Sequence, residues 1–465
     1  MAYKTSKQRR LAALRAVADL PIQTYSIESV DLEGQGIAHH EGKVVFVAGG
    51  LTGERVQAQI TRTRTTYDKA SVTAVLKASS QRVAPACAHF GVCGGCSLQH
   101  VHVGTQVAIK QRALEDQLAH IGKLKGFSLL APIAGTTWGY RYRARLSVKD
   151  VPKKNTVLVG FHERASQYVA DIRSCAVLPP HVSRLLLPLR ALIAQLSIHD
   201  QVPQIEVAVG EVDTVLLMRH LAPLTAQDTA AMDAFALAQA APAMPLIWYV
   251  QPGSHADSIA PLHADRAGNL HYALPAFGIT MPFKVSDFTQ VNHPMNRVLV
   301  SKAIALLAPQ RGERVLDLFC GLGNFTLPLA RTVGPQGFAL GVEGSDTLTA
   351  RAQSNALHNG LSNTAFEARN LFEITTETIY DWGAFDRWLI DPPREGAQAL
   401  CEAVLNLPAS HRPRRMVYVS CNPATLARDA AIVCRTGQWQ LKQAGIANMF
   451  PHTSHVESIA VFERV

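Results

Sequence analysis

Residues 314–325 read Arg-Val-Leu-Asp-Leu-Phe-Cys-Gly-Leu-Gly-Asn-Phe, an apolar segment that runs into a short glycine-rich turn. A second apolar segment ends roughly 20 residues further on, in Gly341-Val342-Glu343-Gly344. Strand, turn, helix, strand and terminal acid in this order are typical of a parallel α/β sheet that binds a nucleotide-like cofactor. From about residue 295 strand-like and helix-like segments alternate, which predicts a Rossmann-like fold for the C-terminal part of the chain.

The position after the glycine turn bears on the kind of cofactor. A dinucleotide site has a third glycine there, because the backbone must approach a pyrophosphate closely. In this chain Thr326 stands at that position. S-adenosylmethionine has no phosphate, so the loop favours it over NAD, and Glu343 is a candidate partner for ribose hydroxyls. The alternative is a structural turn of an α/β fold without a cofactor.

Two further strand ends carry residues suited to chemistry. Residues 415–426 read as a buried strand, a polar turn and a helix, and Cys421 falls at the carboxyl end of the strand. Open α/β sheets place their sites at such ends, and a neighbouring helix N-terminus would stabilise a thiolate. The segment 388–394 ends in Asp391-Pro392-Pro393, and the prolines force an extended exit that directs Asp391 into the same crevice. The alternatives are an inert buried cysteine and a plain loop aspartate.

The end of the chain supplies a candidate base. Alternation of apolar residues from Val456 predicts a last strand, with Glu457 near its start. One reaction that needs a thiolate and a carboxylate base is methylation of carbon 5 of uracil. Attack of Cys421 on carbon 6 would make carbon 5 enolate-like, and Glu457 would then remove the carbon-5 proton. A merely solvated glutamate is the alternative.

The net charge and the apolar content of the chain limit the kinds of partner that it can have. The 465 residues contain 45 Lys and Arg against 36 Asp and Glu, a net charge of +9, which favours an anionic partner such as nucleic acid. No segment reaches the roughly 20 apolar residues of a membrane span, and the basic N-terminus, residues 1–19, lacks the features of a signal peptide. A cytoplasmic protein with reduced thiols is therefore expected.

Two regions are candidates for RNA contact. Glycine-punctuated, β-branched segments predict a small OB-like barrel, with strands expected at residues 25–30, 43–47, 55–61 and 69–76. The basic segment 61–67 is interpreted as a phosphate-contacting loop. Further along, residues 140–145 alternate tyrosine with arginine; on a strand the arginines would share one face and the tyrosines the other, where they could stack on unpaired bases.

A cysteine cluster predicts a metal site. Cys87, Cys93 and Cys96 have C-x5-C-x2-C spacing, and glycines at 94 and 95 would let the backbone fold around an ion. A fourth ligand is needed, and His89 is one possibility for zinc. Thiolate ligands suit zinc and iron–sulfur clusters alike, so spacing does not choose between them.

These motifs together resemble those of the bacterial RNA uracil-C5-methyltransferases, above all the large-subunit ribosomal RNA members that carry a TRAM domain and an iron–sulfur cluster. The likeness extends over nearly the whole chain and includes residues 87–96, 287–292, 420–423 and 454–458. It implies 23S ribosomal RNA as substrate and a [4Fe–4S] cluster whose fourth ligand is Cys175. It also implies Cys421 as nucleophile and Glu457 as base. The cofactor and uracil contacts that it implies are Gln290, Phe319, Asn324, Glu343, Asn370 and Asp391.

The expected organisation is multidomain α/β. A basic arm (1–19) precedes a TRAM domain (20–80), a central α+β iron–sulfur domain (81–280) and an S-adenosylmethionine-dependent methyltransferase domain (281–465) in a monomer. A relative that acts on another ribosomal uridine or on transfer RNA is the nearest alternative. A radical methylating enzyme is disfavoured by the cysteine spacing, and a non-catalytic RNA-binding protein by the set of Cys421, Asp391 and Glu343.

Overall fold

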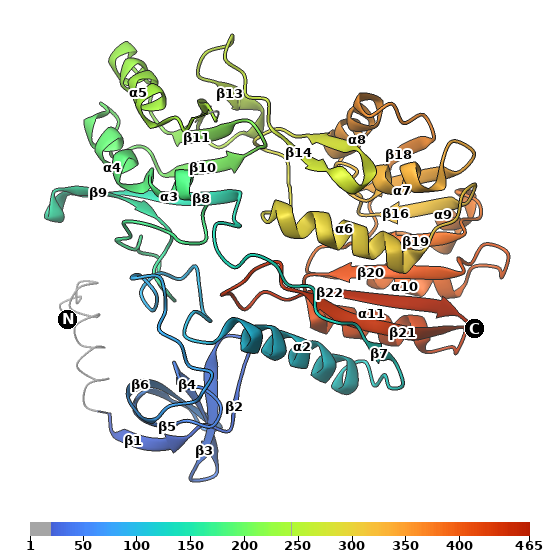
Figure 1. Ribbon diagram of the computed structural model, residues 1–465, viewed down its shortest axis with the longest axis horizontal. Coiled ribbons are helices and arrows are strands. Elements are labelled where there is room, and N and C mark those ends of the chain that lie inside the picture. Colours follow the sequence, from blue (N-terminus) through green and yellow to red (C-terminus); the bar gives the residue numbers. More distant parts are fainter. Residues whose placement is uncertain (1–19, 243) are drawn as a thin grey trace, which may run out of the picture. The chain divides into compact units, whose positions relative to one another are not determined.

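The computed structural model describes residues 20–242 and 244–465 (Figure 1). The predicted basic arm, residues 1–19, lies outside the described residues. The described chain forms two compact units. The first contains residues 20–91, 96–110 and 451–454, and the second contains residues 92–95, 111–450 and 455–465. Among the described helices none is both long and apolar enough to cross a membrane.

The first unit contains a six-stranded sheet in the order β1-β5-β6-β4-β3-β2. The strands are β1 (Ile22–Ser26), β2 (Ser29–Val30), β3 (Gln35–His40), β4 (Lys43–Ala48), β5 (Arg55–Thr63) and β6 (Tyr67–Lys77). Alternate residues of these strands, among them Tyr25, Val45 and Val56, form its apolar core. The expected strands at 43–47, 55–61 and 69–76 are confirmed, whereas the expected strand 25–30 is wrong, because it is divided between β1 and β2, and β3 was missed. The expected loop 61–67 is wrong in part, because β5 continues to Thr63 and β6 begins at Tyr67.

The second unit contains the end of α2 (Val103–His120) and a sheet ordered β13-β12-β11-β10-β8-β9. Helices α4 and α5 pack against this sheet (Figure 1). Helix α5 begins with a capping box between Thr225 and Asp228. The bounds are β8 (Arg143–Val151), β9 (Thr156–Gly160), α3 (Pro180–Ser183), α4 (Leu186–Gln195), β10 (Gln204–Val209), β11 (Thr214–His220), α5 (Ala226–Gln239), β12 (Leu246–Pro252) and β13 (Ala260–Pro261).

The predicted base-stacking face at residues 140–145 is wrong. Strand β8 begins only at Arg143, and Tyr140 is 1% exposed. The ring of Tyr142 stacks on His293, with 4.7 Å between the ring centroids. Tyr140 is therefore buried, and the half-buried Tyr142 has its ring occupied by His293, so the arginines of this segment remain for contact with an anion.

The C-terminal part forms an eight-stranded sheet ordered β18-β17-β16-β19-β20-β22-β21-β7 (Figure 1). Strands β16 to β20 run parallel, while β22 is antiparallel to β20 and β21. The predicted Rossmann-like arrangement is confirmed. The bounds are β7 (Ser128–Leu129), β16 (Arg314–Leu318), β17 (Phe338–Glu343), β18 (Thr364–Ala368), β19 (Arg387–Ile390), β20 (Arg415–Ser420), β21 (Trp439–Ala447) and β22 (Glu457–Arg464).

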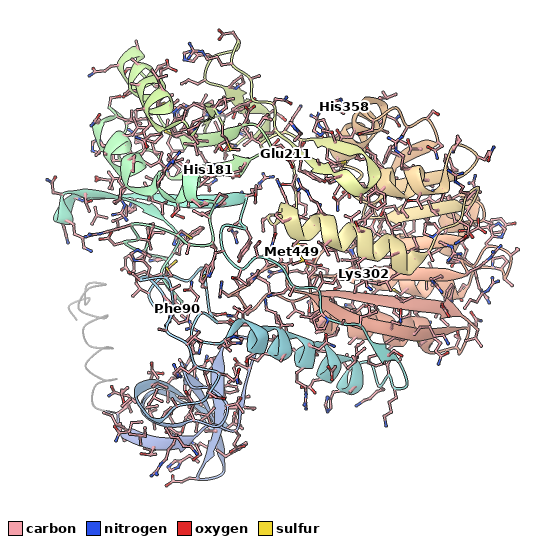
Figure 2. The ribbon with its side chains drawn as sticks, viewed as in Figure 1. Phe90, His181, Glu211, Lys302, His358 and Met449 are labelled. Atoms are coloured by element: carbon pink, nitrogen blue, oxygen red, sulfur yellow. The ribbon has the colours of Figure 1, made fainter. Side chains whose placement is uncertain are left out.

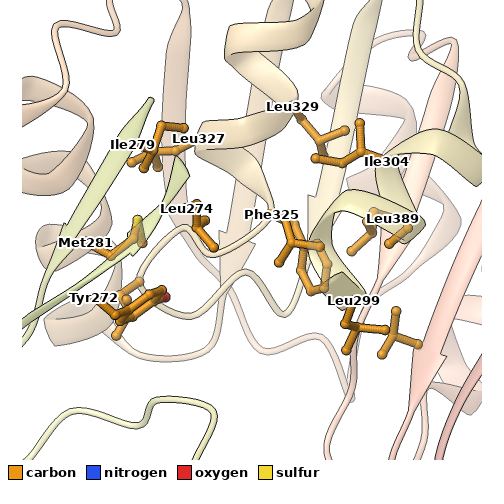
Figure 3. Packing of buried hydrophobic residues seen from close by; sticks show 14 of the residues in the cluster. Tyr272, Leu274, Ile279, Met281, Leu299, Ile304, Phe325, Leu327, Leu329 and Leu389 are labelled. Atoms are coloured by element: carbon orange, nitrogen blue, oxygen red, sulfur yellow. The ribbon is translucent and has the colours of Figure 1, made fainter. Parts of the chain in front are cut away.

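Helices cover both faces of this sheet because its buried strands are apolar on both sides. Val417 and Val419 of β20 belong to the core that includes α6 and α7, whereas the hydroxyl of Tyr418 donates to Asp429 of α11 on the other face. Figure 3 shows that the hairpin of β14 (His271–Leu274) and β15 (Ile279–Pro282) contributes to the first of these cores. The helices are α6 (His293–Leu307), α7 (Thr326–Val333), α8 (Asp346–His358), α9 (Thr376–Asp381), α10 (Gln398–Leu405) and α11 (Pro423–Cys434).

Candidate active site

The topology brings the predicted site residues to one edge of the C-terminal sheet. The chain turns from β16 towards β18 on one side and continues through β19 and β20 on the other, and ligands of open α/β sheets bind at such a switch point. Asp391 follows β19, and Cys421 follows β20. Strand β22 runs the opposite way and pairs Ser458 with Ser420, so one further step of the register places Glu457 opposite Cys421.

The cofactor loop has the conformation that a close backbone approach requires. Gly321 and Gly323 have φ values of 54° and 91°, and a Cβ on Gly323 would lie 2.4 Å from the Leu327 side chain. Phe319 has φ of 65°, an uncommon conformation for an aromatic residue that occurs mainly at functional sites. The Glu343 carboxylate accepts from the amide of Gly321 at 3.1 Å, which ties the end of β17 to the loop.

Thr326, the residue in place of the third glycine, has a defined role in the structure. Its hydroxyl donates to the Asp317 carboxyl at 2.5 Å, and both side chains are buried. Burial raises the pKa of Asp317 to about 8, and the nearby Asp391 and Glu343 contribute to the same direction. A protonated Asp317 at neutral pH fits its fully enclosed position in β16, since ionisation there would leave a charge without solvent.

Asn324 is held by two residues that sequence reasoning missed. Its amide exchanges two hydrogen bonds with the amide of Asn296, at 2.9 and 3.1 Å. The hydroxyl of Tyr272 also donates to Asn324 Oδ1 at 2.9 Å. Asn296 lies one helical turn after Asn292, the N-cap of α6, and Asn292 donates to the carbonyl of Met449. Figure 2 labels Met449 beside α6. Two asparagines four residues apart at a helix start were the available signal.

The other two proposed cofactor contacts lie near these elements. Gln290 is half-buried in the segment that leads from β15 to α6. Asn370 is exposed just after β18, and its side chain accepts from the amide of Phe372 at 3.1 Å. The Phe372 ring lies 5.7 Å from that of Phe319, so the segment after β18 reaches the cofactor loop.

Cys421 is a thiol in the free protein. Burial raises its pKa to about 11, and the neighbouring carboxyls of Glu457 and Asp391 act in the same direction. Arg394 opposes them. The expectation that the start of α11 would yield a thiolate is therefore wrong for the free protein, because desolvation and two nearby acids outweigh the helix N-terminus.

Glu457 and Asp391 are also perturbed. Glu457 is 3% exposed, which rules out the solvated strand-end alternative. Burial, with the adjacent Asp391, raises the pKa of Glu457 well above its usual value. Burial raises the pKa of Asp391 to about 7. Three acids with shifted pKa values in one crevice are characteristic of a catalytic site, and a carboxylate of raised pKa is a stronger base.

The predicted metal site stays a prediction. Within the two described ranges, no group of three or more His, Cys, Asp or Glu residues is placed so as to hold a metal ion. Cys87 and Cys96 belong to the first unit, and Cys93 and Cys175 to the second. Cys175 is buried and the other three are half-buried, while the amide of Gly95 donates to the Cys93 sulfur at 3.5 Å.

Comparison with known proteins finds a family match in the N-terminal part and in the C-terminal part of the chain. Residues 271–465 match the family model of tRNA (uracil-5-)-methyltransferases, and residues 22–73 match that of the TRAM domain. A 23S rRNA (uracil(1939)-C(5))-methyltransferase RlmD of Bordetella bronchiseptica is 57% identical over 443 residues, which cover 95% of this chain and 93% of the relative. A protein of the same description from Burkholderia thailandensis is 53% identical and covers 94% of both chains.

A solved structure shows the same fold. The Pyrococcus abyssi tRNA (uracil-54, C5)-methyltransferase, solved in complex with S-adenosyl-L-homocysteine, aligns with a TM-score of 0.70 and 20% identity, over 95% of this chain and 100% of that one. The likeness confirms the methyltransferase-type α/β fold that the strand and helix alternation predicted.

Proposed function

The chain belongs to the RlmD family of 23S rRNA (uracil-C5)-methyltransferases, and from this membership we propose that it methylates carbon 5 of one uridine of 23S ribosomal RNA. The observation that carries the proposal is the register of β20 and β22, which pair as far as Ser420 and Ser458, so that Cys421 and Glu457 are the next residues of the two strands. Asp391 is close enough to shift the pKa values of both. This is the thiol and base pair that carbon-5 substitution needs.

The residues divide the chemistry between them. S-adenosylmethionine would supply an electrophilic methyl group, held by the cofactor loop with Phe319, Asn324 and Glu343. Once its thiol proton has passed to water, Cys421 Sγ adds as a thiolate to carbon 6 of uracil, so that the electron pair of the double bond moves to carbon 5 and its adjoining carbonyl. After carbon 5 takes the methyl group, Glu457 removes the carbon-5 proton. The bond between Sγ and carbon 6 then breaks, which restores the double bond and the cysteine.

Asp391 is proposed to hold the edge of the uracil. Burial raises the pKa of Asp391, which favours the protonated carboxyl. A neutral carboxyl can donate a hydrogen bond to the uracil oxygen on which negative charge develops. Gln290 and Asn370 complete the proposed set of contacts to uracil and cofactor.

We also propose that Cys87, Cys93, Cys96 and Cys175 hold a [4Fe–4S] cluster. Four cysteines suit such a cluster, and the amide of Gly95 supplies one hydrogen bond to the Cys93 sulfur, as is common around thiolate ligands. Its role would be structural, keeping the region that contacts RNA in place. A purified protein with neither iron nor the visible absorbance of a cluster under anaerobic conditions would refute this, and a redox dependence of turnover without a change in RNA affinity would refute the structural role.

The RNA-binding surface, the oligomeric state and the location of the enzyme are proposals as well. The TRAM strands are expected to contact RNA, and the enzyme is expected to act as a monomer in the cytoplasm, where ribosomal RNA is available. Gel filtration with and without RNA tests the monomer.

Release of tritium tests the reaction. RNA labelled with tritium on carbon 5 of uridine is incubated with the protein and S-adenosylmethionine, and tritium in water is counted. Release should depend on the cofactor, favour 23S over transfer RNA, and fall by at least about a thousandfold in Cys421→Ala, as with loss of other catalytic nucleophiles. Cys434→Ala, at the other end of α11, is the matched control and should retain activity. Undiminished release from Cys421→Ala would refute the proposed nucleophile.

A further inference from the structure

Helix α11 does more than carry Cys421 at its start. Four side chains from its N-cap and first turns form hydrogen bonds with the backbone of residues 394, 395 and 397 in the loop that follows Asp391, which fastens the helix to the loop. The bonds are Asn422 Nδ2 to the Arg394 carbonyl (3.1 Å), Thr425 Oγ1 to the Arg394 carbonyl (3.2 Å), Arg428 Nη2 to the Glu395 carbonyl (2.8 Å) and the Ala397 amide to Asp429 Oδ2 (2.7 Å). Pro392 and Pro393 limit the loop further, and it therefore holds Arg394 at a fixed place.

The Arg394 side chain is oriented as well. It is exposed, and its Nη2 donates to Nδ1 of His455 at 2.9 Å. Because a guanidinium has no acceptor, His455 must be neutral with its proton on Nε2 in this arrangement. The His455 ring is in turn 5.3 Å from that of Phe450. His455 lies two residues before Glu457, so the guanidinium is positioned at the rim of the catalytic crevice.

The charge of Arg394 is not neutralised by the protein. Its neighbours in the crevice, Cys421, Asp391 and Glu457, are all acids, yet among the described residues none forms an ion pair with it at 4.0 Å or less. A uridine that enters this crevice brings its flanking phosphates to the rim, where a cation without an ion-pair partner attracts them. An exposed, preoriented guanidinium offers paired N–H donors for one phosphate.

We propose that Arg394, fixed by α11 and oriented by His455, binds a backbone phosphate next to the target uridine and so docks that nucleotide over Cys421. The inference rests on the proposed function, because it takes RNA as the substrate. His455 acts as the positioning residue of the pair. In this proposal Arg394 contributes to RNA affinity and not to the chemical step.

Steady-state methylation of a 23S rRNA fragment by the full-length protein, at several salt concentrations, tests the proposal. Arg394→Gln should raise KM for RNA by about tenfold, as expected for a lost charge-assisted contact. It should leave kcat within about twofold and reduce the slope of log KM against log salt by about 1. Arg394→Lys should keep the slope and raise KM less. Arg435→Gln, an exposed arginine at the far end of α11, is the control and should match the native enzyme.

Two further measurements make the result decisive. S-adenosylmethionine affinity should be unchanged in Arg394→Gln, which shows that the variant is folded. Arg394 has one alternative role, which is to stabilise the thiolate of Cys421. The pH profile of Cys421 alkylation by iodoacetamide distinguishes that role from RNA binding. A fall in kcat with unchanged KM and salt slope, together with an alkylation profile moved to higher pH, would overturn the proposal and assign Arg394 to the thiolate. If the native protein methylates no RNA, the proposed function itself is overturned and this inference with it.

Discussion

The two sides of the candidate active site give their carboxyl groups different environments. On the cofactor side, Glu343 at the end of β17 accepts hydrogen bonds from the amides of Gly321 and Ser345, at 3.1 and 3.3 Å. On the side of β19, β20 and β22, burial raises the pKa values of Asp391 and Glu457, which also lie close to each other. Backbone amides stabilise a charged carboxylate, whereas burial beside another acid disfavours it.

This difference separates binding from chemistry. The proposed contact of Glu343 with ribose hydroxyls requires a carboxylate whose geometry is set before the ligand arrives. The proposed removal of a proton from carbon by Glu457 requires a base of high pKa, and burial raises the pKa of Glu457. Three experiments test this comparison. They replace the proposed base, titrate the buried Asp317, and remove a side chain that supports the cofactor loop.

Replacing the base should have the largest effect. Glu457→Gln should slow methylation by about 10²–10⁴-fold, the usual contribution of a general base. Because addition of Cys421 and methyl transfer precede proton removal, a covalent protein–RNA adduct should accumulate and be visible on a denaturing gel. Glu463→Gln, near the far end of the same strand and ion-paired with Arg415, should methylate normally. Fast turnover by Glu457→Gln without an adduct would show that another group is the base.

The titration of Asp317 should be visible in stability. Its pKa is raised from 3.8 to about 8 in the folded protein, so the folded state binds the proton more tightly than the unfolded state. The stabilisation is complete below pH 4 and is lost as pH rises towards 8, by at most about 1.4 kcal/mol per pH unit. Chemical denaturation between pH 6 and 9 measures this slope, which should be shallower in Asp317→Asn. An equal slope in both proteins would show that other groups cause it.

The smallest effect is expected behind the cofactor loop. Asn296→Ala removes the amide that pairs with Asn324, and a neutral hydrogen bond contributes about 1 kcal/mol. The dissociation constant for S-adenosylmethionine, measured by calorimetry, should rise roughly fivefold, with no change in Cys421 alkylation. Asn406→Ala, exposed at the end of α10, is the control. An unchanged affinity in Asn296→Ala would mean that Asn324 needs no support from α6.

The expectations that rest on local pattern agree with the structure. Strand β16 with its glycine turn, the strand that ends before Cys421 and the short strand before Asp391 lie where the apolar segments and turn residues put them. These features depend on neighbours in sequence, since an apolar run and the turn that ends it are set within a few residues. Strand β3 was missed because its histidines and glycine obscure the alternation.

The features that the sequence did not predict depend on contacts between distant segments of the chain. The alternation of Tyr142 with arginines predicted a contact with RNA. Instead, its ring packs on His293 from α6, some 150 positions away. Tyr272 and Asn296 support Asn324 from two other elements. The proposed reacting groups, Cys421, Asp391 and Glu457, could be named from the chain alone. Their protonation was not, because a pKa depends on burial and on charges through space, and only the folding of β22 against β20 encloses these acids together.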